Sequence, residues 1–257
     1  MCAKKDITAS GLSFCVVIPV YNESAGVDKC IRSVCNRLNS LPYRTALIVV
    51  DDGSSDDTGL ILKRLVAEFA ELHVLSHNKN LGYGSALKSG TKRAAEMGFE
   101  YVLFMDSDLT NDPMYLPLFV EKMKQGYDVI KASRYIDGGR VSGVPVWRTI
   151  VSVIGNRVAM MLYRLPIRDC TNGFRAVKTD ILCRLHLQEN GFAIIMEELY
   201  QVKFLARTFC EVSYTLGARA KSDRPSSFAY HPKVFFVYLK YAIKSFLKIV
   251  PPRLQLL

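Results

Sequence analysis

The feature that most constrains this 257-residue sequence is an apolar run that ends in two closely spaced aspartates. Residues 101–105 read Tyr-Val-Leu-Phe-Met, which is typical of a buried strand, and Asp106 and Asp108 follow directly. In open α/β sheets, ligands bind at the carboxyl ends of the strands, where these two carboxylates would lie. Because neighbouring carboxylates repel each other unless a cation joins them, the pair indicates either a divalent-cation site or an acidic turn.

Strand and helix patterns alternate through the first half of the chain. Apolar runs at residues 14–18, 46–50 and 74–75 predict strands, and apolar residues at helical spacing follow them. This alternation predicts βαβ units and an α/β fold with a mostly parallel sheet flanked by helices. The polar loops after the strands would then meet at one edge of the sheet, which collects Tyr21, Glu23, Asp51, Asp52, Asp106 and Asp108.

The second half is less regular. We expect a strand at residues 129–132, a helix from about Pro145 to Leu162, a helical stretch around Glu197 and Glu198, and a strand at 211–216. The predicted domains are a flexible N-terminus at residues 1–12, one main domain at 13–228, and a basic amphipathic helix and tail at 229–257.

The charge balance limits the partners of this protein. The chain has 34 Lys and Arg against 24 Asp and Glu, a formal net charge of +10. Such a surplus suits a polyanion, an anionic membrane surface or phosphorylated substrates. Seven cysteines occur without the paired spacings of zinc sites, which indicates reduced thiols and a cytoplasmic location. We find no signal peptide and no run that reads as a membrane-spanning helix.

The C-terminal segment from Pro232 to Val250 combines many apolar residues with regularly spaced lysines. Lys240, Lys244 and Lys248 recur every four residues and form one stripe on a helix. This pattern predicts a helix that lies in a membrane interface. Two alternatives are a helix packed on the main domain with solvated lysines, and a helix that binds a hydrophobic partner subunit.

Several short motifs occur in order at the predicted strand ends. They are P-x-Y-N-E at 19–23, D-D-G-S-x-D-x-T at 51–58, N-x-G-x-G at 80–84, D-x-D at 106–108, S-R-Y at 133–135 and D-x-T-x-G-F-R at 169–175. As a set, these motifs resemble family-2 glycosyltransferases, in particular the branch that loads sugars onto polyprenyl phosphates, such as dolichyl-phosphate mannose synthases. The resemblance covers roughly residues 14–228.

This resemblance implies a GT-A (Rossmann-like) fold, a Mg²⁺ or Mn²⁺ ion and a nucleoside-diphosphate sugar. The implied donor-binding positions, all within the motifs, are Pro19, Tyr21, Glu23, Asp51, Asp52, Gly82, Asp106, Ser107 and Asp108. Asp106 and Asp108 would face the metal. Arg134, Arg148 and Arg219 fall where this branch has arginines that hold donor and acceptor phosphates, and guanidinium groups suit phosphate oxygens.

The expected reaction is an inverting transfer of a hexosyl group to a polyprenyl or dolichyl phosphate. We favour GDP-mannose as the donor, with UDP-glucose, UDP-GlcNAc or a glycan hydroxyl acceptor as alternatives. A phosphate monoester is mostly dianionic at pH 7 and needs little help from a base, whereas a hydroxyl acceptor requires a carboxylate. Asp169 is the candidate for that base, or for a residue that orients a phosphate-binding arginine.

The sequence departs from the family pattern after the D-x-D motif and in the late basic loop. Thr110 stands where the family often has Gln, and the Ser-Lys pair expected after Arg219 is missing. We expect no nucleic-acid partner. The predicted location is cytoplasmic, with peripheral contact to the cytoplasmic face of a membrane or to a membrane partner.

Overall fold

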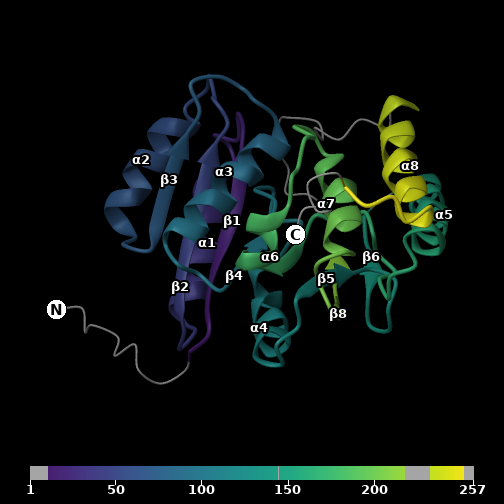
Figure 1. Cartoon of the computed structure of the whole chain (residues 1–257). Coiled ribbons are helices and arrows are strands. Elements are labelled where there is room, and N and C mark those ends of the chain that lie inside the picture. The colour runs from purple at the N-terminus through teal and green to yellow at the C-terminus, as the bar shows by residue number, and fades with distance from the viewer. Residues whose placement is uncertain (1–10, 144, 218–231, 252–257) are drawn as a thin grey trace.

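Seven strands form the central sheet of the computed structural model, which describes residues 11–143, 145–217 and 232–251 (Figure 1). The strand order is β3-β2-β1-β4-β7-β5-β8. Their bounds are β1 Ser13–Val20, β2 Arg44–Asp51, β3 Leu72–Ser76, β4 Tyr101–Phe104, β5 Val129–Ser133, β7 Arg175–Lys178 and β8 Phe209–Ser213. A separate pair of short parallel strands consists of β6 (Arg140–Val141) and β9 (Thr215–Leu216).

The sheet is mostly parallel, as the sequence predicts. Strands β1, β2, β3 and β4 pair in parallel, and so do β5 and β8, whereas β7 runs antiparallel to both β4 and β5. Since β7 is reversed, the loop before it, at residues 169–174, lies at the edge where the other strands end. The sequence analysis did not predict β7, because its four residues carry no long apolar run.

Helices cover both faces of the sheet. Alternate residues of β1 point to opposite faces: Phe14, Val16 and Ile18 belong to one apolar core, and Cys15 and Val17 to the other. The first core is closed by α1 (Val27–Asn39), α2 (Thr58–Glu68) and α4 (Leu116–Lys124), with the short 3-10 helix η1 (Pro113–Tyr115). The second is closed by α3 (Tyr83–Glu96), α6 (Thr179–Arg184), α7 (Ile194–Val202) and buried residues of α5 (Val146–Tyr163) and α8 (Pro232–Phe246).

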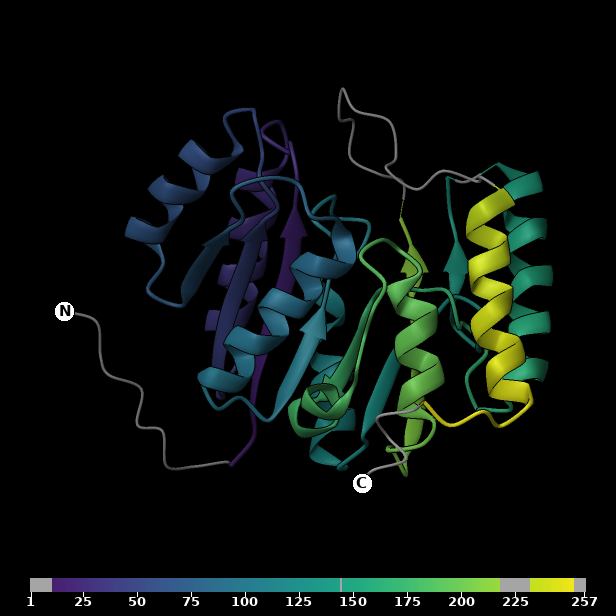
Figure 2. The same ribbon diagram turned by 45° about the horizontal axis from the view of Figure 1, so that its top comes forward.

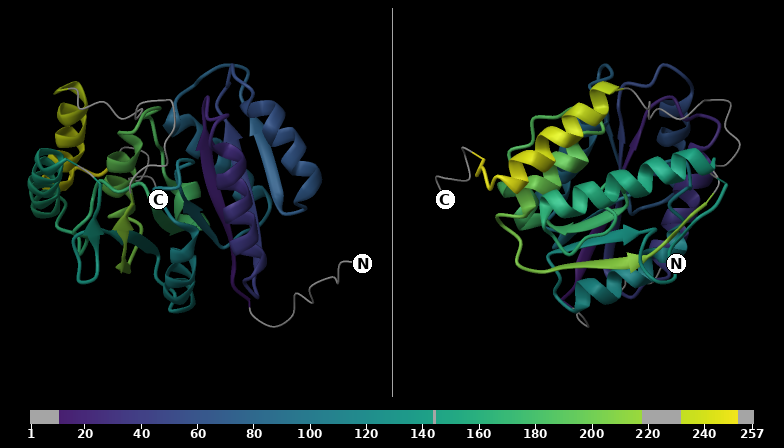
Figure 3. Two further views of the ribbon diagram at one scale, coloured as in Figure 1. Left: turned by 180° about the vertical axis from the view of Figure 1, so that it is seen from behind. Right: turned by 90° about the vertical axis from the view of Figure 1, so that its right-hand side faces the viewer.

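Helices α5 and α8 lie side by side at the end of the molecule that is far from β3 (Figures 1 and 2). Helix α7 lies between α8 and the sheet in Figure 2 and contacts α8. The two views in Figure 3 show the same pairing of α5 with α8 from the back and from the side. The predicted helices therefore exist, and α8 ends at Phe246 rather than near Val250.

The prediction of a single strand at residues 211–216 is wrong. The structure has two strands there, β8 in the main sheet and β9 in the small one, with Tyr214 between them. The Tyr214 side chain is buried and packs edge-on against Phe174 and Tyr115, which separates the two strands. Of the predicted flexible segment 1–12, residues 1–10 lie outside the described part, and Leu12 is already buried.

The six cysteines in the described ranges are unpaired. Cys15, Cys30, Cys35 and Cys170 are buried, whereas Cys210 is only partly buried. Burial raises the pKa of the Cys30 thiol to about 12, so it stays protonated and packs as a small apolar side chain.

Close packing of α3 on β1 generates a stability prediction. Gly90 lies in α3, and a Cβ added there would be 2.4 Å from Cγ1 of Val17. Overpacking of this kind costs about 1–3 kcal/mol, which is offset only in part by about 1 kcal/mol of better helix propensity. We expect Gly90→Ala to lower the urea concentration at the midpoint of unfolding. In the double variant Gly90→Ala/Val17→Ala, which removes the crowded methyl groups, part of this loss should be recovered.

The matched control is Gly155→Ala in α5, where an added Cβ meets nothing within 4 Å. This variant should be as stable as the wild type or slightly more stable. Unchanged stability in Gly90→Ala would contradict the tight contact between α3 and β1.

Candidate functional site

The turns after β1 and β2 are bound to each other. The Asn22 amide donates to Oγ of Ser54 at 2.9 Å, and the Ser55 amide donates to Oδ1 of Asn22 at 2.8 Å. The Glu23 amide donates to Oγ1 of Thr58 at 2.9 Å. Asn22 has a φ of 52°, a left-handed conformation that Asn tolerates better than most residues. The first two motifs therefore form one unit, which includes the predicted residues Pro19, Tyr21 and Glu23.

Asp52 fixes the loop that follows β3. Its carboxylate is almost fully buried and accepts the Leu81 amide at 2.9 Å and the Gly82 amide at 2.7 Å. Nδ1 of His77 lies 2.6 Å from Oδ1 of the same group. The neighbouring carboxylate of Asp51 accepts the Ser54 amide at 3.0 Å. Both aspartates thus shape the predicted donor-binding loops by holding backbone amides.

Gly82 and Gly84 are required by a close backbone contact. Gly82 has a φ of 98°, and a Cβ there would be 2.4 Å from the carbonyl oxygen of Asn190. At Gly84 a Cβ would be 2.5 Å from the carbonyl oxygen of Glu189. The N-x-G-x-G motif therefore reflects contact with residues about 100 positions later in the chain.

Asp106 and Asp108 follow β4 and are both partly exposed, whereas Ser107 between them is buried. The Tyr83 hydroxyl donates to Oδ1 of Asp106 at 3.3 Å. Oδ1 of Asp108 accepts the amide of Thr110 at 3.0 Å and its hydroxyl at 2.7 Å. Thr110, the departure from the family pattern, thus binds directly to the second aspartate.

The turn that carries the two aspartates is held from behind by residues that the sequence analysis missed. Oδ1 of Asn111 accepts the Asp106 amide at 2.9 Å, and its Nδ2 donates to the Tyr214 hydroxyl at 3.1 Å. The Tyr214 hydroxyl in turn donates to the carbonyl of Thr110. Tyr214 is 103 residues away from Asn111, so no local pattern predicts the contact.

The donor set at this turn fits a hard divalent cation that is shared with a phosphate ligand. Asp106 and Asp108 offer partly exposed carboxylate oxygens. Among the described residues, no group of three or more His, Cys, Asp or Glu side chains could hold a metal ion. Mg²⁺ is commonly bound by one or two carboxylates together with water and substrate phosphates, which matches two protein ligands.

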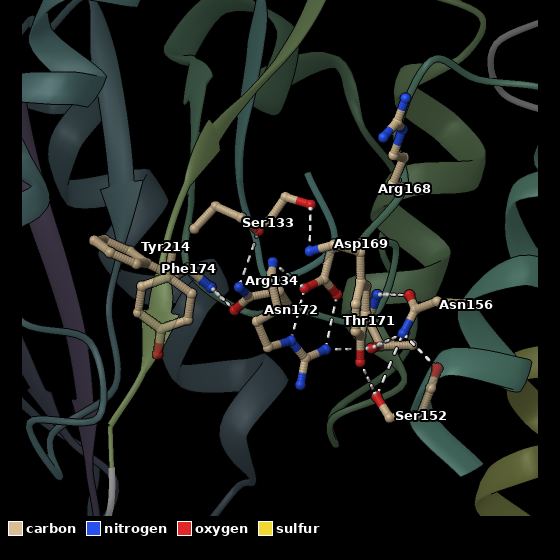
Figure 4. A network of polar contacts seen from close by, with 12 residues as sticks. Ser133, Arg134, Ser152, Asn156, Arg168, Asp169, Thr171, Asn172, Phe174 and Tyr214 are labelled. Carbon is tan, nitrogen blue, oxygen red and sulfur yellow. Dashed lines mark hydrogen bonds and ion pairs between the residues drawn. The ribbon is translucent and has the colours of Figure 1, made fainter. Parts of the chain in front are cut away.

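A second charged centre lies where β5 ends. The Arg134 guanidinium binds Asp169 through both oxygens, with Nε to Oδ2 at 2.7 Å and Nη2 to Oδ1 at 2.8 Å (Figure 4). The Arg134 amide also donates to Oδ2 at 3.1 Å. Asp169 is fully buried, and Oε1 of Glu211 accepts its backbone amide at 2.9 Å. Burial alone would lower the pKa of Arg134, but Asp169 raises it overall, so the guanidinium stays charged.

Helix α5 contributes polar side chains to this centre. Nδ2 of Asn156 donates to Oγ1 of Thr171 at 3.0 Å, and Oδ1 of Asn156 accepts the Thr171 amide at 3.2 Å (Figure 4). Nη2 of Arg134 donates to the same Thr171 hydroxyl at 3.2 Å. The Ser152 hydroxyl lies 2.7 Å from that of Tyr135. The network joins α5 to the loop before β7.

Asn156 is buried and was missed by the sequence analysis, although a signal for it exists. Arg148, Ser152 and Asn156 recur every four residues and form a polar stripe on a mostly apolar helix. Arg148 is half-buried, with its guanidinium carbon 5.2 Å from the centre of the Trp147 ring. Arg219 lies outside the described residues.

Two further buried cations stiffen the loop at residues 169–175. Arg175 forms a bidentate ion pair with Glu198 at 2.5 Å for each contact, and its guanidinium carbon lies 4.3 Å from the centre of the Phe104 ring. Nζ of Lys131 donates to the carbonyl of Asn172 at 2.7 Å. Burial and the nearby Arg175 lower the pKa of Lys131 to about 8. Removing one partner of such a buried ion pair is strongly destabilising, so these contacts hold the loop in place.

A cavity of about 460 Å³ connects the two charged centres to an apolar groove. Its polar walls include Asp106, Asn111 and Arg134, and its apolar walls come mainly from α5 and α8. The apolar lining residues are Val151, Val158, Ala159, Leu162, Met196, Leu216, Phe235, Leu239 and Ala242. One cavity thus has charged and polar side chains on part of its wall and apolar side chains on the rest.

The outer surfaces of α5 and α8 are strongly apolar as well. Exposed large side chains there are Val146, Trp147, Ile150, Val151, Ile154, Val158, Met160 and Met161 on α5, and Phe235, Phe236, Leu239, Ile243 and Phe246 on α8. An exposed apolar patch of this kind marks an interaction surface. No helix in the described ranges is long and apolar enough to cross a membrane.

Comparison with known proteins relates this site to a family. The model of "Glycosyl transferase family 2" matches residues 15–185. A dolichol-phosphate mannosyltransferase of Pyrococcus furiosus is 32% identical over 229 residues, which cover 88% of this chain and 61% of that protein. An undecaprenyl-phosphate mannosyltransferase of Micrococcus luteus is 28% identical over 214 residues, which cover 82% of this chain and 86% of that protein. This chain therefore spans less than two thirds of the Pyrococcus relative.

The fold is similar to that of a solved glycosyltransferase. Glucosyl-3-phosphoglycerate synthase from Mycobacterium tuberculosis, in complex with Mn²⁺, UDP and phosphoglyceric acid, superposes with a TM-score of 0.65 at 23% identity. The match covers 94% of this chain and 80% of that one. This likeness confirms the predicted GT-A fold. Since the family model covers more than half of its residues, the chain belongs to glycosyl transferase family 2, as its motifs predicted.

Proposed function

We propose that this protein transfers a hexosyl group from a nucleoside-diphosphate sugar to the phosphate of a polyprenyl lipid. The observation that carries the proposal is the cavity that has Asp106 and Arg134 on its polar walls and α5 and α8 on its apolar walls. A polyprenyl phosphate has the same two parts, a dianionic head and a hydrocarbon chain. The mannosyltransferases of Pyrococcus furiosus and Micrococcus luteus are named for acceptors of this class.

The donor would bind at the ends of β1, β2 and β4. In this proposal Pro19, Tyr21 and Glu23 line the nucleoside pocket, and Asp51, Asp52 and Gly82 shape its loops. Asp106 and Asp108, with Ser107 between them, would hold Mg²⁺ or Mn²⁺ against the diphosphate. The bound cation would neutralise charge on the leaving diphosphate. Solved relatives of similar fold contain Mn²⁺ or Mg²⁺ together with UDP, which supports this choice of ions.

The acceptor phosphate would lie next to Arg134. Its guanidinium is bound on one side by Asp169, and it still lines the cavity. Arg148 and Arg219 are the further arginines proposed to bind phosphate. An oxygen of the acceptor phosphate attacks the anomeric carbon, the bond from that carbon to the diphosphate breaks, and the configuration inverts. Because the acceptor is already anionic, catalysis rests on positioning and charge stabilisation.

Asp169 is proposed to orient Arg134 rather than to act as a base. Both of its oxygens bind the Arg134 guanidinium, and the side chain is fully buried. A base for a hydroxyl acceptor needs an oxygen free to take a proton. These contacts favour a phosphate acceptor over a glycan hydroxyl.

The exposed apolar face of α5 and α8 is proposed to rest on the cytoplasmic face of a membrane, where polyprenyl phosphates are found. Residues of the same two helices line the cavity, so a lipid would reach it from the bilayer surface in this proposal. The predicted stripe of three lysines on one helix is wrong for Lys248, which lies beyond the end of α8 at Phe246 and has a φ of 53°. Lys240 lies 3.6 Å from Glu189, and the Lys240 and Lys244 amines lie 4.7 and 5.8 Å from the centre of the Tyr241 ring. In this proposal residues 13–228 form the catalytic domain, and its helix α5 contacts the membrane together with α8 of the C-terminal segment 229–257.

A donor screen tests the proposed function. Purified protein is incubated with Mn²⁺, a polyprenyl phosphate and GDP-mannose, UDP-glucose or UDP-GlcNAc in turn, and the lipid fraction is measured by mass spectrometry. We expect one hexosyl-phosphate lipid, with GDP-mannose as the favoured donor. Transfer only to a glycan hydroxyl, with no lipid product from any donor, would contradict the proposal.

The first functional prediction concerns the metal-binding carboxylates. Asp108→Asn replaces an anionic ligand of a hard cation by a neutral amide, so turnover should fall by roughly a hundred-fold or more. The matched control is Asp112→Asn, which makes the same change at an exposed carboxylate four residues later and should retain activity. Turnover is measured with and without excess chelator, and circular dichroism checks the fold. Full activity in excess chelator would rule out the metal role.

The second concerns the phosphate-binding arginine. Arg134→Lys keeps the charge beside buried Asp169 but loses the bidentate fork, so kcat/KM for polyprenyl phosphate should fall roughly ten- to a hundred-fold. The KM for the nucleotide sugar should change little. Arg157→Lys, an exposed position on α5, is the control. An unchanged acceptor KM and kcat in Arg134→Lys would show that Arg134 does not bind the acceptor.

The third concerns the membrane face. Phe236 on α8 is 71% exposed, and Leu60 on the distant helix α2 is 70% exposed. Phe236→Ser should weaken sedimentation with anionic vesicles by roughly ten-fold, since burial of a Phe side chain is worth about 1.5–3 kcal/mol. Leu60→Ser should sediment like the wild type. Equal losses in both variants, or no vesicle binding by the wild type, would contradict this orientation.

A further inference from the structure

Residues 187–192, between α6 and α7, contact the donor loop on one side and helix α8 on the other. This segment belongs to none of the motifs that identify the family. Its contacts connect the C-terminal helix to residues that surround the proposed nucleotide site.

On the donor side, Asn190 holds the start of α3. Its carbonyl accepts the Gly84 amide at 2.7 Å. Its Oδ1 accepts the Ser85 hydroxyl at 3.0 Å and Nζ of Lys88 at 2.8 Å. Gly82 and Gly84 leave no room for a Cβ against this segment, so the backbones of the loop and the segment are in direct contact.

The same segment reaches the metal-binding carboxylates through an aromatic pair. The Phe192 ring stacks on Tyr83 with 4.6 Å between the ring centres. The Tyr83 hydroxyl donates to Oδ1 of Asp106.

On the other side, Tyr241 of α8 binds the segment. Its hydroxyl donates to Oε1 of Glu189 at 2.7 Å, and the Tyr241 side chain is buried. Glu197 of α7 accepts the amides of Gln188 and Glu189 at 2.8 Å each, which fixes the backbone of the segment. Asn190 follows Glu189 directly, so a displacement of Glu189 is passed to the donor loop.

We infer that Tyr241 is a positioning residue for the donor site. Through Glu189 and Asn190 it sets the position of the loop at residues 80–84, so that the docking of α8 and the binding of nucleoside diphosphate stabilise each other. The coupling is reciprocal: a bound nucleotide strengthens the docking of α8 as much as α8 strengthens nucleotide binding. The inference rests on the proposed function for the identity of the ligand.

The test compares two Tyr→Phe variants at the same helix interface. Tyr241→Phe removes the hydroxyl that binds Glu189. Tyr200→Phe removes a hydroxyl that donates to the carbonyl of Ile249 and does not bind the segment. Equilibrium binding of GDP and of UDP in the presence of Mn²⁺ is measured by calorimetry, so the readout does not depend on turnover or on the lipid acceptor.

We expect Tyr241→Phe to weaken nucleoside-diphosphate binding roughly three- to ten-fold, because only part of one charge-assisted hydrogen bond is transmitted to the site. Its KM for the nucleotide sugar should rise while kcat at saturating donor stays near the wild-type value. Tyr200→Phe should bind like the wild type. Glu189→Ala should behave like Tyr241→Phe. The double variant Tyr241→Phe/Glu189→Ala should bind nucleotide with the same affinity as whichever single variant has the lower affinity.

Three results would overturn the inference. They are wild-type affinity in Tyr241→Phe, an equal loss in Tyr200→Phe, and additive losses in the double variant, which would mean that the two residues act independently. A wild-type protein that binds neither GDP nor UDP with Mn²⁺ would instead refute the proposed function and this inference with it.

Discussion

The buried carboxylate of Asp169 is the constraint on which the acceptor side of the structure depends. Burial of a carboxylate destabilises the fold unless the group is ion-paired and hydrogen-bonded. Here the Arg134 guanidinium forms the ion pair, and the Arg134 amide donates a further hydrogen bond. The pairing is possible only because β7 runs against its neighbours and brings the loop at residues 169–174 to the edge where β5 ends. Glu211 of β8 and Asn156 of α5 then hold that loop from two sides.

The same arrangement explains why one cavity has charged side chains on one part of its wall and apolar side chains on another. Arg134 is immobilised by Asp169 and lines the cavity, and Asp106 lines it from the end of β4. Helices α5 and α8 close the remaining walls with apolar side chains and carry further exposed apolar residues outside. In the proposed function, the acceptor phosphate would lie beside Arg134 and its hydrocarbon chain between α5 and α8, the two helices that are proposed to contact a membrane.

Much of this site could be predicted from local sequence patterns. Strand-ending motifs such as Asp106-x-Asp108 stand next to recognisable apolar runs, and the parallel sheet brings those ends together. Arg134 and Asp169 were singled out by resemblance, and one of the two roles predicted for Asp169 was to orient a phosphate-binding arginine, but the sequence did not indicate which arginine. Residues that support the site, such as Asn111, Asn156 and Asn190, act through partners that are distant in sequence or on another element. Strand β7 is too short to show a period, and the single strand predicted at 211–216 is divided because buried Tyr214 separates β8 from β9.

The central claim is that the cavity between α5 and α8 holds the lipid chain of the acceptor while its phosphate lies at Arg134. Photo-crosslinking with a polyprenyl phosphate that carries a diazirine near its head, followed by peptide mass spectrometry, tests this claim most directly. The account predicts labels on cavity-lining residues such as Val158, Leu162 and Leu239, and their loss when unlabelled polyprenyl phosphate is added in excess. Labels confined to α1, α2 or α4, or labels on α5 and α8 that unlabelled lipid does not displace, would contradict it.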